Sequence, residues 1–211
     1  MTKRLETLFS LIPRCEVFAD VGCDHGYIAN AMLKNGKCDR AIISDVSAEC
    51  LKKAENLLCE NFSGRFTAIV SDGFEKLPYS DCALIAGMGG DIISDILLSA
   101  KSLPEKLVLQ PMKNAERVRR TARSLGYRIT RDYTFRDGKF YDVIVAERGS
   151  DEEYTEAEYV FGRDNLRERG DDFVSLIETK IAELVRAAEF ATDKSRESID
   201  KRITELKKAI K

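Results

Sequence analysis

ADVGCDHGYIANAML, residues 19–33, ends a buried strand, crosses a glycine-bearing turn and begins a helix. Nucleotide-binding turns of this kind usually carry three small residues in a G-x-G-x-x-G spacing. Here Gly22 and Gly26 flank Asp24 and His25, and His25 is the single histidine of the chain. The turn therefore predicts a cofactor site that carries a carboxylate and an imidazole at its tip.

Five short apolar runs extend outward from this turn, and helical patterns separate them. The runs cover residues 15–21, 39–46, 66–73, 81–88 and 105–111, and the helical patterns cover 25–35, 47–62, 90–101 and 113–125. Continuous apolar strands alternating with helices indicate a parallel sheet covered on both faces. We therefore predict an α/β, Rossmann-like fold whose ligands bind at the carboxyl ends of the strands.

Residues 127–148 break this alternation with two β-rich runs joined at Asp137-Gly138, a hairpin turn signal. An antiparallel pair that closes a parallel sheet is typical of class I methyltransferases of the Rossmann-like type. NAD-binding domains usually lack it. The hairpin therefore favours a methyltransferase over an NAD oxidoreductase.

The two ends of the chain are predicted to be helical. Near the start, Leu5, Leu8, Phe9 and Ile12 recur at helical spacing, which indicates an amphipathic helix and not a signal peptide. Residues 150–172 are polar and read as a connector, and apolar residues then recur at 4-3 spacing in two segments separated by TDKSRES. We expect a methyltransferase domain at 1–150 and a coiled-coil hairpin at 151–211, with a single bent helix as the alternative.

Composition sets the class of protein. The 211 residues are 44% hydrophobic and 33% charged, and no apolar run is long enough to cross a membrane. The six cysteines form no C-x-x-C pair and there is one histidine, so we expect no metal site and a reducing, cytoplasmic location. Between Lys113 and Arg148 ten Lys/Arg face five Asp/Glu, a balance compatible with nucleic acid.

Acidic and glycine residues follow the first four predicted strands in order. Asp20 would repel a pyrophosphate but suits the amino and sulfonium groups of S-adenosylmethionine; Asp45 is placed to hold ribose hydroxyls and Asp72 to accept from an adenine amino group. Singly, Asp45 or Asp72 could be a helix cap or a turn residue. The predicted cofactor residues are Asp20, Gly22, Gly26, Asp45, Val46, Ser47, Asp72, Gly73, Phe74, Ala86, Gly87, Met88 and Gly89.

These motifs together make the chain resemble a known family. With KRL near the start, ADVGCDHGYIA, ISDVS, SDGF, IAGMGG, LQP, LGYRI and DGKFYDVIVAE, it resembles the bacterial tRNA (adenine22-N1)-methyltransferases over essentially its whole length. The resemblance implies an S-adenosylmethionine-dependent enzyme with a C-terminal coiled coil, acting on N1 of an adenine in the tRNA D-arm. It also places Arg4 and Gln110 at the cofactor or acceptor pocket. Family members more often carry alanine at position 26 and proline at position 29.

The first turn holds the candidate catalytic residues. Asp24 could accept a hydrogen bond from the adenine amino group and favour the cation that forms on the ring. Tyr27 could stack on the base, and His25 could bond the substrate or the cofactor carboxylate. The alternatives are that Asp24 caps the following helix, that His25 is structural, and that Tyr27 belongs to the core.

A basic helical segment supplies the candidate RNA contacts Arg117, Arg119, Arg120 and Arg123. The functional interpretation is phosphate contact, and the alternative is a solvated surface helix. The partner that we expect is tRNA, and since nothing in the sequence implies an oligomer we expect a monomer. Two rivals remain: a methyltransferase with another acceptor, such as ribosomal RNA or a small molecule, and a non-catalytic RNA-binding module.

Overall fold

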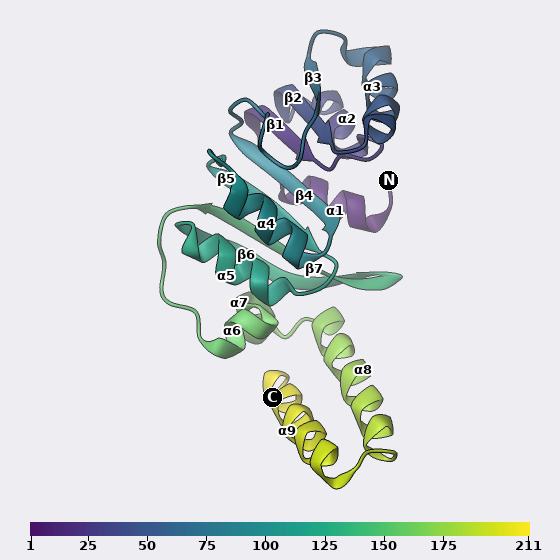
Figure 1. Cartoon of the computed structure of the whole chain (residues 1–211), viewed down its shortest axis with the longest axis vertical. Coiled ribbons are helices and arrows are strands. Elements are labelled where there is room, and N and C mark those ends of the chain that lie inside the picture. The colour runs from purple at the N-terminus through teal and green to yellow at the C-terminus, as the bar shows by residue number, and fades with distance from the viewer.

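One seven-stranded sheet organises the chain, with strand order β3-β2-β1-β4-β5-β7-β6 (Figure 1). This computed structural model describes the backbone of residues 1–211 and every side chain except that of Lys194. The strands β1 to β5 are parallel, and β7 runs antiparallel to both β5 and β6. The strands are β1 (Cys15–Val21), β2 (Cys38–Asp45), β3 (Phe66–Val70), β4 (Cys82–Met88), β5 (Lys106–Pro111), β6 (Tyr127–Asp137) and β7 (Lys139–Arg148).

Helices cover both faces of the sheet. Side chains of α1, α2 and α3 share one buried cluster with sheet residues such as Phe18 and Leu84. Those of α4 and α5 share a second cluster with Ala19 and Ile85 on the opposite face. The helices are α1 (Lys3–Leu11), α2 (Tyr27–Lys34), α3 (Ala48–Phe62), α4 (Gly90–Ser99), α5 (Ala115–Ser124), α6 (Glu156–Phe161), α7 (Arg163–Glu168), α8 (Asp171–Ala188) and α9 (Asp193–Ala209).

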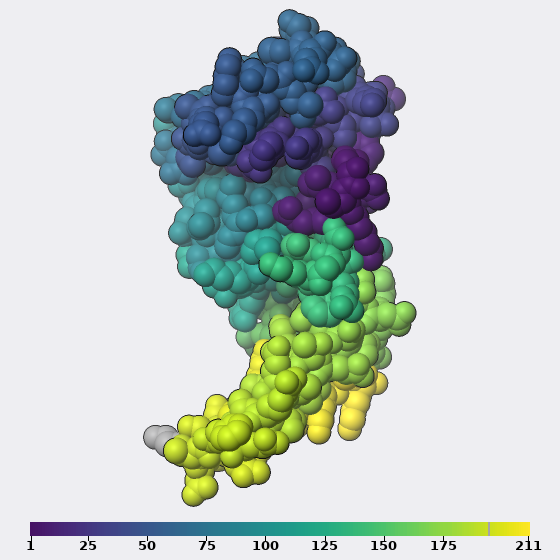
Figure 2. All heavy atoms as spheres, turned by 90° about the vertical axis from the view of Figure 1, so that its right-hand side faces the viewer, coloured from purple at the N-terminus to yellow at the C-terminus, as the bar shows by residue number. Residues whose placement is uncertain are grey.

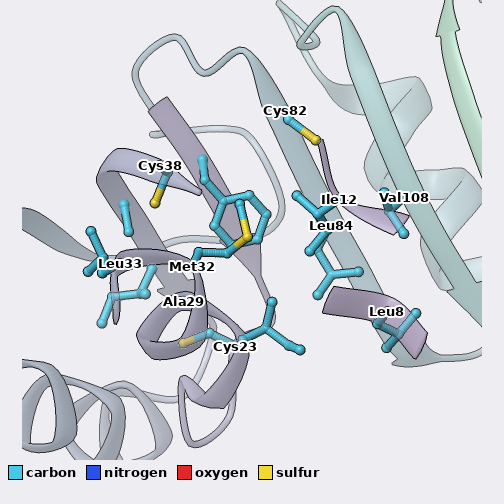
Figure 3. Close-up of a cluster of buried hydrophobic side chains, with 14 of the residues drawn as sticks. Leu8, Ile12, Cys23, Ala29, Met32, Leu33, Cys38, Cys82, Leu84 and Val108 are labelled. Atoms are coloured by element: carbon cyan, nitrogen blue, oxygen red, sulfur yellow. The ribbon is translucent and has the colours of Figure 1, made fainter. Parts of the chain in front are cut away.

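The core explains why the strands read as unbroken apolar runs. Because neighbouring residues of a strand point to opposite faces, Phe18 enters one cluster while Ala19 enters the other. Figure 3 shows part of the first cluster, where Leu8 of α1 and Met32 of α2 lie near Leu84 of β4. Burial on both sides therefore leaves no polar stripe along these strands.

The predicted Rossmann-like fold is confirmed, including the antiparallel β6–β7 hairpin that turns at Gly138. The C-terminal segment forms two helices, α8 and α9, which pack on each other through Phe173, Ile177 and Leu206. The single bent helix is therefore wrong. The reading of residues 150–172 as a polar connector is also wrong in part, since α6 and α7 form there.

The outer edge of β6 is sealed by side chains from the C-terminal segment. The backbone N–H groups of Asp132, Thr134 and Arg136 point away from β7. They donate to the side chains of Asp164 (3.0 Å), Asn165 (2.9 Å) and Asp172 (2.9 Å), respectively. Between Asp132 and Arg136, every second residue of the edge strand thus finds its acceptor outside the sheet, which anchors α7 and the start of α8.

None of the helices in the described part of the chain has the length and apolar character needed to cross a membrane. Within the same described residues, histidine, cysteine and carboxylate side chains form no group of three or more that could hold a metal ion.

Candidate active site

The turn after β1 is built by backbone groups and by residues with positive φ. The N–H groups of Gly22 and Cys23 both donate to the carbonyl of Ser44, at 2.8 and 2.9 Å, which extends the pairing of β1 with β2. Gly22 (φ 72°) then reverses the chain, and a Cβ there would lie 2.0 Å from the methyl carbon of Met88. The left-handed φ favours glycine at this position, and the methyl end of Met88 packs into the space that a Cβ would occupy.

Asp45, at the end of β2, links the turn after β1 to the start of α3 through hydrogen bonds. One of its oxygens accepts the N–H of Ser47 at 2.9 Å, and the other accepts the N–H of Asp24 at 3.3 Å. Ser47 in turn caps α3, accepting from the N–H of Cys50 at 3.3 Å. Each carboxylate oxygen accepts one of these bonds and keeps acceptor capacity, so Asp45 can still receive hydroxyl groups from a ligand.

A pocket of about 530 Å³ opens at this edge of the sheet. It is bounded by the turn after β1, by the end of β4 and by α1. The predicted site residues on its wall are Asp20, Gly22, Asp24, His25, Tyr27, Ala86, Gly87 and Met88. The register of β4 against β5 shifts between Ala86 and Met88, so that Gly87 bulges at the pocket wall. The structure therefore brings the acid-and-glycine turn and the glycine patch to one cavity, as the strand order predicts.

Helix α1 supplies a wall that the sequence predicted only in part. Thr2, Leu5 and Leu8 line the pocket beside Arg4. The apolar spacing of Leu5 and Leu8 predicts helix packing and gives no sign of a site. The guanidinium of Arg4 donates to Gln110 at 2.7 Å, and a Cβ on Gly87 would meet it at 3.0 Å. Gln110 itself is fully buried and acts by holding Arg4.

The start of α1 is fixed by the hairpin. The backbone N–H of Arg4 donates to Asp137 at 2.8 Å, and its guanidinium carbon lies 5.5 Å from the centre of the Tyr141 ring. Figure 2 shows the N-terminal segment beside the β6–β7 hairpin, with α8 adjoining it. The β6–β7 hairpin, which is far from α1 in the sequence, thus holds α1 at one side of the pocket.

Asp20 is the buried acid of the pocket. Its side chain accepts the N–H of Ala29 in α2 at 3.2 Å. Burial is the main influence on this group and raises its pKa to about 7; the Ala29 hydrogen bond opposes the shift and the nearby Asp45 adds to it. A cation placed in the pocket would favour the ionised form of Asp20.

Asp24, His25 and Tyr27 form a linked group at the mouth. The Asp24 carboxylate lies 2.8 Å from His25 Nδ1, and the imidazole stacks on Tyr27 with ring centres 5.4 Å apart. The cap of α2 is Gly26, with no side-chain hydrogen bond, so the alternative that Asp24 caps this helix is wrong. Tyr27 is 51% exposed, so the alternative that it belongs to the core is wrong.

Several predicted cofactor residues lie outside this pocket. A Cβ on Gly26 would lie 2.8 Å from that of Ala54, and one on Gly73 would lie 2.7 Å from a methyl group of Ile96. Helix packing therefore accounts for both glycines. Phe74 is buried in the second core cluster, and Val46 is exposed. The predicted residues that do not line the pocket are Gly26, Asp45, Val46, Ser47, Asp72, Gly73, Phe74 and Gly89.

The four arginines of α5 do not form an open basic face. Arg119 is buried and donates to both oxygens of Asp132 at 2.9 Å, so its predicted phosphate contact is wrong. Arg123 is 13% exposed and pairs with Asp151, which argues against the same role. Helical spacing could not reveal this, because the partners come from β6 and from the following segment.

The two remaining arginines are more exposed but are also engaged. Arg117 reaches Asp91 at 3.0 Å and Asp95 at 2.8 Å. Arg120 reaches Glu116 at 2.9 Å and Glu156 at 2.6 Å. Their contact with RNA stays a prediction, and it would require these ion pairs to be shared or exchanged.

Known proteins that are similar to this chain include tRNA methyltransferases. A tRNA (adenine(22)-N(1))-methyltransferase of Bacillus subtilis (strain 168) is 32% identical over 156 residues, 71% of this chain and 66% of that protein. The crystal structure of the B. subtilis m1A22 tRNA methyltransferase TrmK is 26% identical, with a TM-score of 0.89 covering 100% of this chain and 99% of that one. M. capricolum TrmK, solved with S-adenosyl-homocysteine, shares the fold at 22% identity, with a TM-score of 0.91 over 100% and 97% of the chains.

The family follows from the sequence model as well as from these likenesses. A model described as a methyltransferase domain matches residues 1–144, which include β1 to β5 and most of the β6–β7 hairpin. The chain belongs to the methyltransferase-domain family.

Proposed function

We propose that this chain transfers a methyl group from S-adenosylmethionine to N1 of an adenine in the D-arm of tRNA. The observation that carries the proposal is the pocket, in which a buried acid and a glycine-lined wall face an exposed carboxylate, imidazole and phenol. The family supports methyl transfer, and the activity for which the B. subtilis relatives are named supports tRNA as the acceptor.

The residues present fit S-adenosylmethionine. Asp20, whose ionised form is disfavoured by burial, would be restored to its charged state by the amino or sulfonium cation of the cofactor. Gly22 and Gly87 give the backbone close access to the pocket, and Asp45 has acceptor capacity for ribose hydroxyls. When bound, the cofactor supplies a methyl group on a positively charged sulfur.

The acceptor chemistry asks for alignment more than for a base. N1 of neutral adenine already carries a lone pair, so the protein must extract the base, orient it, and stabilise the positive charge that arrives on the ring. Asp24 stands at the mouth with an ionisable carboxylate that can accept from the exocyclic amine, and this contact strengthens as the ring becomes cationic.

His25 and Tyr27 act on this carboxylate and on the base. The 2.8 Å contact between His25 Nδ1 and Asp24 fixes the direction of the carboxylate, while the stacked ring of Tyr27 holds the imidazole. Tyr27 is 51% exposed and offers an aromatic surface for an extracted base. We infer that Asp24 and Tyr27 contact the adenine and that His25 positions Asp24.

The test is direct. The full chain is incubated with methyl-labelled S-adenosylmethionine and unmodified tRNA, and the RNA is digested to nucleosides. We expect label in 1-methyladenosine, lost when the single target adenosine of the D-arm is replaced by guanosine. Label in no nucleoside, or only in N6-methyladenosine, would overturn the proposal.

Parallel incubations decide between acceptors. Ribosomal RNA and free adenosine take the place of tRNA under identical conditions, with equal amounts of adenine present. Transfer to tRNA alone supports the proposal, whereas preferential transfer to ribosomal RNA or to a small molecule replaces it with the corresponding methyltransferase.

A further inference from the structure

A second cleft, of about 470 Å³, lies between the sheet and the C-terminal helices. One wall is the segment after β5, a second is the β6–β7 hairpin, and the third comes from α8 and α9, which extend beyond the β6 edge of the sheet (Figure 1). Its walls carry the cations Lys113, Lys180 and Arg202, one from each of three separate segments, together with the ring of Phe140.

This cleft lies next to the pocket of the candidate active site, because backbone hydrogen bonds join residues that line the two cavities. The N–H of Met112 donates to the carbonyl of Met88 at 2.8 Å, and the N–H of Gly90 donates to the carbonyl of Lys113 at 2.9 Å. Met88 lines the pocket while Met112 and Lys113 line the cleft. The ends of β4 and β5 are therefore joined into one partition, whose β4 side lines the pocket and whose β5 side lines the cleft.

Lys113 is placed on this partition by the local backbone. Its Cε lies 3.3 Å from where a Cβ on Gly89 would stand, so the stem of the lysine covers the residue after Met88. Asn114, the next residue, takes a left-handed conformation (φ 55°) and is held by Asp91 at 2.7 Å. Lys113 thus extends from a fixed turn, with its stem over Gly89.

The carboxylates of the cleft are bonded to other side chains, whereas its cations are at least partly exposed. Its carboxylates are engaged: Asp142 accepts from Thr134 at 2.9 Å and lies 3.6 Å from buried Arg119, and Glu116 accepts from Arg120 at 2.9 Å. Lys113 and Lys180 are exposed, and Arg202 is half exposed and pairs with Glu205 of its own helix. A polyanion would therefore meet cations on two of the three walls and carboxylates that are already bonded.

We propose that this cleft binds the sugar–phosphate backbone of the RNA strand that enters the active-site pocket. Lys113, Lys180 and Arg202 contact successive phosphates, and Phe140 lies against a base. A basic groove with an aromatic ring is the arrangement that suits an unpaired strand, which must be the local state of RNA when one base is extracted. The inference rests on the proposed function and replaces the paired arginines of α5 as the main phosphate contacts.

The experiment measures binding and methyl transfer separately. Affinity for unmodified tRNA is measured by fluorescence anisotropy at several salt concentrations, for the full chain and for the double variant Lys113→Glu/Lys180→Glu. We expect binding to weaken by about tenfold or more near 0.1 M salt, and the slope of log affinity against log salt to fall by roughly 0.7–0.9 per lost phosphate contact.

The matched control is Lys101→Glu/Lys201→Glu, which makes the same charge change at exposed lysines outside both cavities. Phe140→Leu tests the base contact at constant charge, so it should weaken binding without altering the salt slope. Equal affinities and slopes for the cleft variant and the control would overturn the inference. S-adenosylmethionine binding, measured by calorimetry, should be unchanged in all variants.

Failure of the inference differs from failure of the proposed function. If the unchanged chain methylates tRNA and the cleft variant binds and methylates it equally well, the cleft is not the RNA path although the function stands. If the unchanged chain transfers no methyl group to tRNA, the proposed function fails and takes this inference with it.

Discussion

Carboxylates gather in two regions of this molecule, and they are balanced in opposite ways. Where α5, β6 and the C-terminal segment meet, Asp132 and Asp151 are held by Arg119, Arg123 and Arg163. At the pocket, Asp20 is buried like Asp132 but receives one backbone hydrogen bond, from Ala29. The first region balances its charges within the protein. In the second, the influences on the pKa of Asp20 include no cationic side chain, and we propose that a bound ligand supplies the cation.

The two buried acids, Asp20 and Asp132, differ in whether a cationic side chain compensates for their burial. Burial raises the pKa of both Asp20 and Asp132; at Asp132 the Arg119 guanidinium opposes that rise, while at Asp20 the nearby Asp45 adds to it. A buried acid without a cation costs stability in the free protein, so its retention fits a binding role better than a packing role.

The largest effect on stability is expected where α5, β6 and the C-terminal segment meet. Replacing Arg119 with methionine leaves Asp132 buried without its cation and should lower the free energy of unfolding by about 3–5 kcal/mol. Urea unfolding of the full chain measures this loss. The exposed Arg117→Met is the control and should be nearly neutral. A similar, small loss in both variants would show that the Arg119–Asp132 pair is not a structural requirement.

Asp20→Asn should instead raise the free energy of unfolding at pH 8. Since the folded pKa is about 7 and the unfolded value 3.8, the folded chain retains a proton that the unfolded chain has lost between these values. Stability conferred by that proton therefore declines as pH rises through this window, by about 2–3 kcal/mol between pH 5 and 8. The asparagine variant lacks this decline, so it should gain on the unchanged chain at pH 8.

Urea unfolding at pH 5 and pH 8 checks the prediction, and parallel pH profiles for the two proteins would refute it. The same substitution should weaken S-adenosylmethionine binding at pH 8, where the carboxylate is charged, more than at pH 5. A gain in stability joined to a loss of affinity is the signature of an acid kept for its ligand.

Asp24→Asn should act on turnover alone. Loss of the charge that stabilises the cationic ring should reduce the rate constant for methyl transfer by about 100-fold. Cofactor affinity and unfolding should stay close to those of the unchanged chain, because Asp24 is exposed. Single-turnover kinetics and calorimetry separate these effects, with Asp39→Asn at the other end of β2 as the control. Unchanged turnover would exclude Asp24 from the chemistry.

The smallest effect is expected at the start of α6. Thr155 accepts from the N–H of Glu158 at 3.2 Å in a capping box, so Thr155→Ala should cost about 1 kcal/mol. Thr192 stands at the same position of α9 without such a bond, and Thr192→Ala is therefore the matched control. Thermal unfolding compares the two. A larger loss than in Arg119→Met would reverse the ranking of these contacts.

The sheet and the first turn could be predicted because their signals are local. The run at 15–21 coincides with β1, and Asp137-Gly138 coincides with the hairpin turn. Apolar runs flanked by glycine and acidic residues suffice for such elements, since the chain must bury the one and turn at the other. The division into domains at residue 150 stays a prediction.

The burial of charged and polar side chains could not be predicted from the sequence, because it depends on partners far along the chain. Arg117 and Arg119 are two residues apart, yet one is exposed and the other fully buried against Asp132. Arg163 and Asn165 lie in a segment that reads as polar linker, although both are buried. A charged residue that is neutralised by another element looks, in sequence, the same as one that faces water.

The sealed edge of β6 bears on how the protein could be divided. A chain that stopped at residue 150 would lose the side chains of Asp164, Asn165 and Asp172, and three N–H donors would face solvent in a row. An open strand of this kind can accept a strand from another molecule, which leads to aggregation. By covering the edge of β6, the C-terminal segment thus protects the protein from self-association through this strand.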